Sequence, residues 1–428
     1  MKFYLETYGC QMNEADSELV MALLKNAGHE PVVDIDQADV IIFNTCSVRQ
    51  HAENRVLGRI SCELKRKLDK PELKIGIIGC MAQRIGEELV RENIGLDFAV
   101  GVDQYENLPQ LIAKRENIAL TSCKEAELYE NLNPDFTGNF CDYVTIMKGC
   151  NNFCSYCIVP YVRGRERSRA VKDIENDIKL ASLKGIKDIT LLGQNVNSYH
   201  WQDYNFPKLL KHLNKCEGFS RLRFLTSHPK DLSDELIEVM AEGGKICEHI
   251  HLPLQSGDND VLAQMNRHYT IEDYLILIDK LRKNIPNLAI TTDLIVGFPG
   301  ETDKQFENTI MAVQTIGFDY AFCFKYSNRS GTKASEMTNQ IDEQTRLLRL
   351  QQLIEVQREQ TKKKFQAQIG KTVEILVEGK SKKGGNQVSG KTRDFKICAF
   401  EGGENIIGQI VRVRVTGATA GTLIGVMI

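Results

Sequence analysis

Short apolar runs alternate with amphipathic helical patterns near the start of this chain, and that alternation limits the folds open to it. In the first 120 residues the expected strands are 3–5, 39–43, 74–78 and 98–100, and the expected helices are 16–27, 52–68, 85–91 and 105–115. Asn13 is the expected cap of the first helix and Gly28 its stop. Strands joined through helices run parallel, so this stretch predicts an open parallel α/β sheet.

The same alternation resumes at residue 142 and repeats six times. Its expected strands are 143–147, 188–192, 221–225, 249–252, 288–296 and 318–324, with helical patterns between them at 174–183, 234–240, 274–282 and 306–316. Six repeats predict a partial (β/α)6 barrel, in which chemistry takes place at the carboxyl ends of the strands.

The last part of the chain changes character. A long helix is expected at 342–368, followed by β runs at 373–377, 397–400, 410–415 and 423–427 that predict a small β-barrel. A chain of 428 residues is too long for one core. We therefore expect an α/β protein with domains at residues 1–118, 137–364 and 365–428.

Thirteen cysteines occur in a chain that shows neither a secretory signal nor a membrane span. The first residues include Glu6 and lack a basic-then-apolar pattern. No apolar run approaches the roughly 18 residues that cross a bilayer. These features predict a cytoplasmic protein with no membrane partner, in which cysteines bind metal or act in catalysis rather than form disulfides.

Three of the cysteines, Cys150, Cys154 and Cys157, lie in the nine-residue stretch GCNNFCSYC. Thiolates are soft ligands that suit zinc or iron–sulfur clusters. Structural zinc usually takes four ligands, and no fourth Cys or His follows closely. A buried helix face is the alternative, but Gly149 before the run and Pro160 after it are typical of loops. Three thiols would leave one iron of a cluster open to a small molecule.

The Cys-x3-Cys-x2-Cys spacing resembles the signature of the radical S-adenosylmethionine (radical SAM) enzymes. The resemblance implies that Cys150, Cys154 and Cys157 hold a 4Fe–4S cluster. It further implies that the open iron of this cluster chelates the amino and carboxylate groups of S-adenosylmethionine.

A second set of three cysteines is spread over the first stretch. Cys10, Cys46 and Cys80 each follow an expected strand of the parallel sheet. Because ligands gather at the carboxyl ends of such strands, the three thiols should converge at one edge. We interpret them as ligands of a second iron–sulfur cluster, again with one open iron.

This N-terminal part resembles the methylthiotransferases, whose first domain carries a second 4Fe–4S cluster on three cysteines. The string YGCQMNEADS at residues 8–17 is similar to the MiaB-type tRNA branch. The RimO-type ribosomal-protein branch usually reads Gly-Cys-Pro-Lys-Asn there. The MtaB-type branch, which acts on threonylcarbamoyl-adenosine, usually reads Gly-Cys-Lys-Val-Asn.

Polar loops after the barrel strands are the candidate cofactor site. GFPGE at residues 297–301 resembles the radical SAM glycine motif that lies behind the adenine of S-adenosylmethionine. The loops after the second, third and fourth strands begin GQNVNS, SHP and QSG. The candidate cofactor-binding residues are Gln194, Asn195, Ser227, Gln255, Gly297, Gly300 and Glu301.

Two basic regions predict contact with RNA. The run RGRERSR at residues 163–169 suits phosphates, although a solvated charge run is the alternative. Residues 360–396 hold ten Lys and Arg against three Asp and Glu, which favours a polyanion partner. The final β region is similar to the RNA-binding TRAM domain, but KICAF at 396–400 departs from the VVNF often seen there. The candidate RNA contacts are Arg163, Arg165, Arg167, Lys382, Lys383, Lys391 and Arg393.

The resemblance covers essentially the whole chain and implies radical methylthiolation of carbon 2 of isopentenyl-adenosine, beside the anticodon of a tRNA. It implies two 4Fe–4S clusters, S-adenosylmethionine, a donor such as a flavodoxin or ferredoxin, and a monomer. Threonylcarbamoyl-adenosine, a ribosomal protein, and a non-enzymatic iron–sulfur RNA-binding protein stay open as alternatives. The other seven cysteines are expected to be small buried packing residues: Cys62, Cys123, Cys141, Cys216, Cys247, Cys323 and Cys398.

Overall fold

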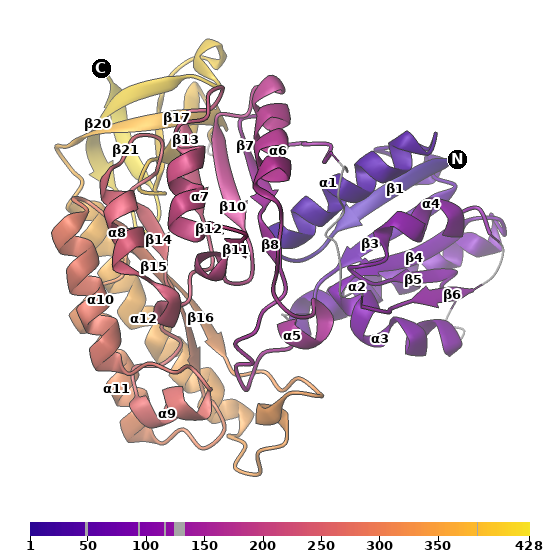
Figure 1. The fold of residues 1–428 in the computed structure, drawn as a ribbon, viewed down its shortest axis with the longest axis horizontal. Helices are drawn as coiled ribbons and strands as arrows, with labels where there is room; N and C mark the ends of the chain where they lie inside the picture. The colour runs from indigo at the N-terminus through magenta and orange to yellow at the C-terminus, as the bar shows by residue number, and fades with distance from the viewer. Residues whose placement is uncertain (48–49, 93–94, 115–116, 124–132, 383) are drawn as a thin grey trace.

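The computed structural model describes residues 1–428 except 48–49, 93–94, 115–116, 124–132 and 383. Figure 1 shows a parallel-sheet part at the N-terminus, a central part of strands and helices, and a closed barrel at the C-terminus. This is the α/β architecture that the sequence predicted.

The N-terminal part is a six-stranded parallel sheet in the order β2-β1-β3-β4-β5-β6. The strands are β1 (Lys2–Thr7), β2 (Glu30–Pro31), β3 (Val40–Thr45), β4 (Lys74–Gly79), β5 (Phe98–Val100) and β6 (Ile118–Leu120). The helices are α1 (Gln11–Asn26), α2 (Gln50–Leu64), α3 (Cys80–Arg91) and α4 (Leu108–Leu111). The strand order reverses between β1 and β3, which is the place where such sheets bind ligands.

Helix boundaries in this part differ from the predicted ones. The predicted cap Asn13 lies inside α1, because the helix starts at Gln11 and its N-cap is Cys10. Asn13 instead completes a capping box with Cys10. α3 begins at Cys80 rather than at residue 85. Both changes place a cysteine at the N-terminus of a helix.

The central part is an open (β/α) barrel of six parallel strands in chain order. Two three-stranded sheets, β13-β10-β7 and β14-β15-β16, are joined by a parallel bridge between Leu222 and Ile246. The strands are β7 (Cys141–Thr145), β10 (Asp188–Leu192), β13 (Arg221–Phe224), β14 (His249–His251), β15 (Ala289–Val296) and β16 (Tyr320–Lys325). The helices are α6 (Val171–Leu183), α7 (Phe206–Leu213), α8 (Asp234–Ala241), α9 (Asn259–Gln264), α10 (Ile271–Asn284) and α11 (Asp303–Ile316).

Local sequence signals explain where several of these helices begin and end. Thr270 and Thr302 form capping boxes at the starts of α10 and α11. Gly317 ends α11 with φ 59°, a left-handed conformation that glycine adopts without steric penalty. One large apolar core then joins these helices to the barrel strands.

The C-terminal part follows the long helix α12 (Glu343–Gln366) and is a closed barrel in the order β17-β18-β19-β21-β20. Its strands are β17 (Thr372–Lys380), β18 (Gln387–Thr392), β19 (Ile397–Glu401), β20 (Ile410–Ala418) and β21 (Leu423–Met427). Four of the five match predicted runs. β18 was missed, because Val388 is its one large apolar residue facing the core, beside Gly390 and Thr392.

Buried charges join the last two parts. Arg223 is 3% exposed, and its Nε donates to Asp188 at 2.9 and 3.0 Å. Its other nitrogens donate to the carbonyls of Thr392 and Arg393 at 2.9 and 2.6 Å. The barrel is thereby held against the strand ends opposite to those that carry the signature cysteines.

Candidate functional site

The signature cysteines occupy the loop after β8 (Met147–Lys148), beyond the carboxyl end of β7. Gly149 opens the loop with φ 81°, and a Cβ there would lie 1.9 Å from the carbonyl oxygen of Arg165, so only glycine fits. The N–H of Cys150 donates to the carbonyl of Gly164 at 3.1 Å. Gln194 accepts from the N–H of Gly149. The loop is therefore fixed from two sides before any cofactor binds.

Cys150 and Cys154 are buried and Cys157 is partly exposed, and the thiols of this loop affect one another. Cys150 and Cys154 are each 9% exposed. Burial raises the pKa of Cys150, and it raises the pKa of Cys157 to about 12; the neighbouring Cys154 adds to both shifts. The buried Arg267 donates from Nη1 to the sulfur of Cys154 at 3.4 Å. Three thiols on one loop, with a buried cation beside one of them, fit a 4Fe–4S cluster.

Three of the predicted cofactor residues carry buried polar atoms that lack a hydrogen-bond partner within the described part of the chain. These atoms are Ser227 Oγ, Gln255 Oε1 and Glu301 Oε1. Leaving such an atom unpaired costs about 1–3 kcal/mol. Gln255 also has φ 71°, a strained conformation for a residue other than glycine. Unsatisfied acceptors and stored strain fit a polar ligand such as S-adenosylmethionine.

The other predicted cofactor residues have protein partners. Asn195 donates to Asp231 at 2.7 Å and accepts from the N–H of His228 at 3.1 Å, which ties two strand-end loops together. A Cβ on Gly297 would lie 2.4 Å from Arg346 Cγ, and one on Gly300 would lie 2.2 Å from Asn339 Nδ2. These glycines allow the approach of neighbouring chain segments, and their contact with a cofactor stays a prediction.

One carboxylate oxygen of Glu301 has protein partners, and the other is the buried Oε1, which has no hydrogen-bond partner among the described residues. Its Oε2 accepts from Arg349 Nη1 at 2.8 Å and from the N–H of Gly297 at 2.7 Å. Arg349 belongs to α12, so the helix that leads to the C-terminal barrel also orients a predicted cofactor residue. Sequence spacing could not reveal this pair, since the two residues lie 48 positions apart.

The second set of thiols converges at the edge of the N-terminal sheet. Cys10 is the N-cap of α1, Cys46 follows β3, and Cys80 begins α3. Because β1, β3 and β4 are adjacent and parallel, their carboxyl ends meet. The positive ends of α1 and α3 favour anionic sulfur at Cys10 and Cys80.

A buried asparagine pair closes this edge. Asn13 Nδ2 donates to Asn44 Oδ1 at 3.0 Å and to the carbonyl of Thr45 at 3.2 Å. Asn44 Nδ2 donates back to the Asn13 carbonyl at 2.8 Å. The loops that carry Cys10 and Cys46 are therefore locked to each other.

The thiols of the second set interact with one another and with an arginine. A hydrogen bond with Cys46 is the main cause that lowers the pKa of Cys10 to about 6, against the effect of burial; Arg163 lowers it further. Burial raises the pKa of Cys80. Arg163 Nε lies 3.2 Å from the sulfur of Cys80, and its Nη1 is a buried donor with no partner among the described residues. A sulfur-rich anion such as a 4Fe–4S cluster would supply the missing acceptor.

Gly79 offers a sharp test of this convergence. At φ 91°, a Cβ would lie 2.5 Å from Asn44 Oδ1 and 2.6 Å from the carbonyl oxygen of Thr45. We expect Gly79→Ala to displace Cys80 and to remove the iron of the second site, about four atoms per chain. Total iron after anaerobic reconstitution measures the effect.

Gly28→Ala is the matched control for this change. Gly28 has φ 81°, but an added Cβ would meet nothing within 4 Å. It therefore carries the backbone strain of a left-handed alanine, about 1–2 kcal/mol, without the clash. Equal iron loss in both variants would show that strain alone, rather than crowding at the thiols, removes the cluster.

The structure separates the arginines of residues 163–169. Arg163 is 3% exposed and pairs with Asp16 at 2.8 Å, so it faces protein, and the predicted phosphate contact is wrong for this residue. Arg167 pairs with Asp103 at 2.9 Å. Arg165 is exposed, with its guanidinium 4.3 Å from the centre of the Phe153 ring. Of the three, Arg165 is the exposed one, and its contact with RNA stays a prediction.

The basic residues of the C-terminal barrel divide in a similar way. Arg393 pairs with Glu248 and donates to the carbonyl of Ile246, so it helps to dock the barrel on the core. Lys391 pairs with Glu378 at 3.2 Å. Lys382 is exposed, and Lys383 lies outside the described residues. RNA contact stays a prediction for these residues.

Sequence reasoning missed two buried residues of the central part. One is Arg267, described above, and the other is His228, which is 6% exposed. Burial is the main cause that lowers the pKa of His228 to about 2, and Arg267 adds to it, so the ring is neutral. Its Nδ1 accepts from the N–H of Lys230, which leaves the proton on Nε2. Its place in the string SHP was the signal that could have identified it.

The cysteines outside the two sets do not all pack in the core. Cys247 and Cys398 are buried, as predicted. Cys62 and Cys123 are exposed, so the packing prediction is wrong for them. The remaining three are partly exposed: Cys141, Cys216 and Cys323.

Three family models match the chain in succession. They are the uncharacterized protein family UPF0004 at residues 2–101, the Radical SAM superfamily at 144–313 and the TRAM domain at 366–428. The first two cover the two sets of cysteines.

Solved structures share the fold at low sequence identity. The radical S-adenosylmethionine methyltransferase TsrM from Kitasatospora setae aligns with a TM-score of 0.59 at 14% identity, over 75% of this chain and 72% of TsrM. The cobalamin-dependent S-adenosylmethionine radical enzyme OxsB aligns with a TM-score of 0.54 at 12% identity, over 83% of this chain and 56% of OxsB.

Curated relatives match over the full length. The tRNA-2-methylthio-N(6)-dimethylallyladenosine synthase of Thermoanaerobacter sp. (strain X514) is 45% identical, over 100% of this chain and 92% of the relative. The enzyme of the same name from Clostridium tetani (strain Massachusetts / E88) is 46% identical, over 99% of this chain and 95% of the relative. The chain therefore belongs to the radical SAM family of tRNA-2-methylthio-N(6)-dimethylallyladenosine synthases, the MiaB-type methylthiotransferases.

Proposed function

We propose that this chain is the enzyme that places a methylthio group on carbon 2 of isopentenyl-adenosine, beside the anticodon on its 3′ side. The observation that carries the proposal is the pair of three-thiol sites, one at the barrel strand ends and one at the edge of the N-terminal sheet. Full-length similarity to enzymes of that name supports the substrate. The target base lies in a single-stranded loop, so it can be turned out of its stack at little cost.

The reaction has two parts, activation of the C–H bond and insertion of sulfur, and each is assigned to one cluster. Carbon 2 carries an unactivated C–H bond that no side-chain base can deprotonate. Cys150, Cys154 and Cys157 would hold a cluster that supplies the electron for reductive cleavage of S-adenosylmethionine, and Cys10, Cys46 and Cys80 would hold a cluster that supplies the sulfur of the methylthio group, whose methyl group would come from a second S-adenosylmethionine.

The protein positions these groups and keeps water from them. Ser227 and Gln255 present unpaired oxygens from two strand-end loops, where they can accept from the amino and ribose groups of S-adenosylmethionine. Arg267 balances the charge of the thiolate at Cys154. His228 is neutral and buried, and its Nε2–H can donate to substrate without bringing a charge into the site.

We assign contacts with the tRNA backbone to Arg165 and Lys382, which are both exposed. Arg165→Ala should weaken tRNA binding and lower the slope of log K against log salt by about 1, because one phosphate contact is lost. Equilibrium binding at several salt concentrations measures both effects.

Lys304 is the control for the Arg165 change. It is an exposed cation on α11, where it pairs with Glu307 at 3.6 Å. Lys304→Ala should leave the salt slope unchanged. A slope that also stays unchanged in Arg165→Ala would remove this residue from the RNA-binding surface.

Other features of the enzyme are part of the same proposal. We infer domain boundaries at residues 1–118, 137–364 and 365–428, a flavodoxin or ferredoxin as electron donor, and a monomer in the cytoplasm. Within the described residues, every helix is too short or too polar to cross a bilayer.

A panel of substrates tests the assignment. Reconstituted enzyme, S-adenosylmethionine and a reductant are incubated without oxygen with tRNA bearing isopentenyl-adenosine, tRNA bearing threonylcarbamoyl-adenosine, or ribosomal proteins. We expect a methylthio product from the first alone. A product from either of the others would move the enzyme to another branch of the methylthiotransferases.

A further inference from the structure

The segment after the signature cysteines leaves the radical SAM site and enters the N-terminal part. Cys157 is followed by α5 (Val159–Val162), which packs against α3. Ile158 and Val162 are 5% and 1% exposed and belong to the same apolar cluster as Cys80. Within five residues of Cys157 in the first site, the chain is therefore anchored in the apolar cluster that holds Cys80 of the second.

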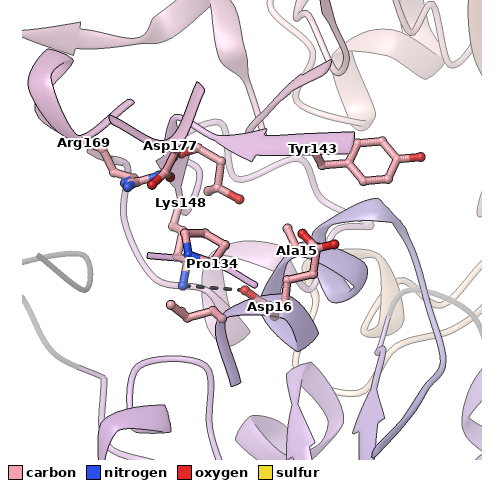
Figure 2. A pocket seen from close by; sticks show the side chains of 10 residues that line it. Ala15, Asp16, Pro134, Tyr143, Lys148, Arg169 and Asp177 are labelled. Atoms are coloured by element: carbon pink, nitrogen blue, oxygen red, sulfur yellow. Dashed lines mark hydrogen bonds and ion pairs between the residues drawn. The ribbon is translucent and has the colours of Figure 1, made fainter. Parts of the chain in front are cut away.

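Arg163 comes next and is held in a defined position. Its Nη2 donates to Asp16 Oδ2 at 2.8 Å, and its Nε lies 3.2 Å from the sulfur of Cys80. Asp16 also accepts from Tyr105 Oη at 3.3 Å and lies 3.6 Å from Lys148 Nζ. Figure 2 shows Lys148 and Asp16 pointing at each other across the hollow between the N-terminal part and the barrel.

The charges around Arg163 do not cancel. Asp16 faces two cations, Arg163 and Lys148, which are 3% and 4% exposed. Arg167 and Asp103, which also act on Lys148, pair with each other, so one positive charge stays in excess. Arg163 lies beside the thiol of Cys80 and interacts with that of Cys10, in a region of low dielectric constant where such interactions are strong. Arg163 Nη1 adds a buried donor with no partner among the described residues.

A cation and hydrogen bonds at cluster sulfurs stabilise the form with more electrons, so they raise the reduction potential of the cluster. We propose that Arg163 is a positioning residue for the second cluster: it donates to sulfur at that site, sets its potential, and fixes it relative to the radical SAM loop. The inference rests on the two-cluster function proposed above. It adds that the radical SAM core contributes a residue to the environment of the N-terminal cluster.

The test uses the full chain with Cys150, Cys154 and Cys157 changed to Ala, so that the second cluster is observed alone. Arg163→Gln and Arg163→Lys are made in this background, reconstituted without oxygen, and titrated with dithionite while the electron paramagnetic resonance signal is followed. Arg169→Gln is the matched control. Arg169 lies on the same segment, is partly buried and pairs with Asp177 at 2.7 Å, in the core rather than at the thiols.

We expect Arg163→Gln to retain iron but to need a more negative potential. At the midpoint potential of the parent, the ratio of reduced to oxidised cluster should be at least tenfold lower in the variant. This corresponds to a midpoint potential lower by about 59 mV for a one-electron couple. Arg163→Lys keeps the charge but loses the forked donor, so its shift should be smaller. The Arg169→Gln control should titrate like the parent.

Two results would overturn the inference. One is Arg163→Gln with bound iron and the potential of the parent. The other result applies if Arg163→Gln loses its iron. In that case Arg163→Lys is the deciding variant, and a signal and potential equal to those of the parent would leave Arg163 with a structural role only. An absence of iron in the parent background itself would instead contradict the two-cluster function, so the two failures are distinguishable.

Discussion

Changing Cys150, Cys154 and Cys157 together to Ala is expected to abolish both cleavage of S-adenosylmethionine and methylthiolation. Iron after reconstitution should fall from about eight to about four atoms per chain, since one 4Fe–4S cluster is lost. The reason is that the open iron of this cluster is the proposed binding point of the amino and carboxylate groups. Iron analysis and chromatographic detection of 5′-deoxyadenosine measure the two effects.

Three cysteines outside both sites provide the control for this change. Cys62 and Cys123 are exposed and Cys216 is partly exposed, so replacing them removes three thiols with little effect on packing. That variant should keep about eight iron atoms and full activity. Loss of all iron from the signature variant would contradict the account, because it would leave no independent second site.

Changing Cys10, Cys46 and Cys80 together to Ala should separate the two parts of the reaction. The variant should hold about four iron atoms and still form 5′-deoxyadenosine, but it should yield no methylthio nucleoside. The first cluster lies on the barrel and its ligands are intact, whereas the sulfur-carrying site is gone. Formation of 5′-deoxyadenosine serves as the internal control for folding.

The outcome that contradicts this second expectation is continued methylthiolation. It would mean that the sulfur comes from elsewhere and that the convergence of the three N-terminal thiols has another purpose. Loss of both activities together would indicate that the N-terminal site is needed to shape the radical SAM site, because Ile158 and Val162, which follow the signature loop, pack in the N-terminal core.

Both cysteine sets and the order of folds were predictable from the sequence. Adjacent parallel strands bring their carboxyl ends to the same edge of a sheet. The placement of Cys10, Cys46 and Cys80 at one edge could therefore be predicted from strand positions alone. The (β/α) repeats and the final barrel followed from apolar periodicity. β18 was missed because its core-facing positions hold Val388, Gly390 and Thr392, which show no apolar alternation.

The partners of charged residues were not predictable. In the sequence, Arg163 and Arg165 look alike, yet the first is buried against Asp16, 147 positions away, and the second is exposed. Arg393 likewise pairs with Glu248 across the interface between barrel and core. Composition indicates that a segment is basic, whereas tertiary packing decides which of its cations are buried against protein and which are exposed.

Glu301 shows the same limit for the cofactor site. Its motif predicted a place beside S-adenosylmethionine, but its ion pair with Arg349 depends on how α12 packs along the barrel. The unpaired oxygens of Ser227 and Gln255 could be found only when every neighbour was in place. The sequence thus indicates which loops form the site, and the structure shows which atoms remain available to a ligand.

One measurement tests the central claim most directly. Reconstituted enzyme is incubated without oxygen with isopentenylated tRNA, S-adenosylmethionine and a reductant, and both nucleosides and adenosine products are quantified by mass spectrometry. The account predicts 2-methylthio-isopentenyl-adenosine together with 5′-deoxyadenosine and S-adenosylhomocysteine, because each site uses its own S-adenosylmethionine. Formation of 5′-deoxyadenosine without any methylthio nucleoside would contradict it.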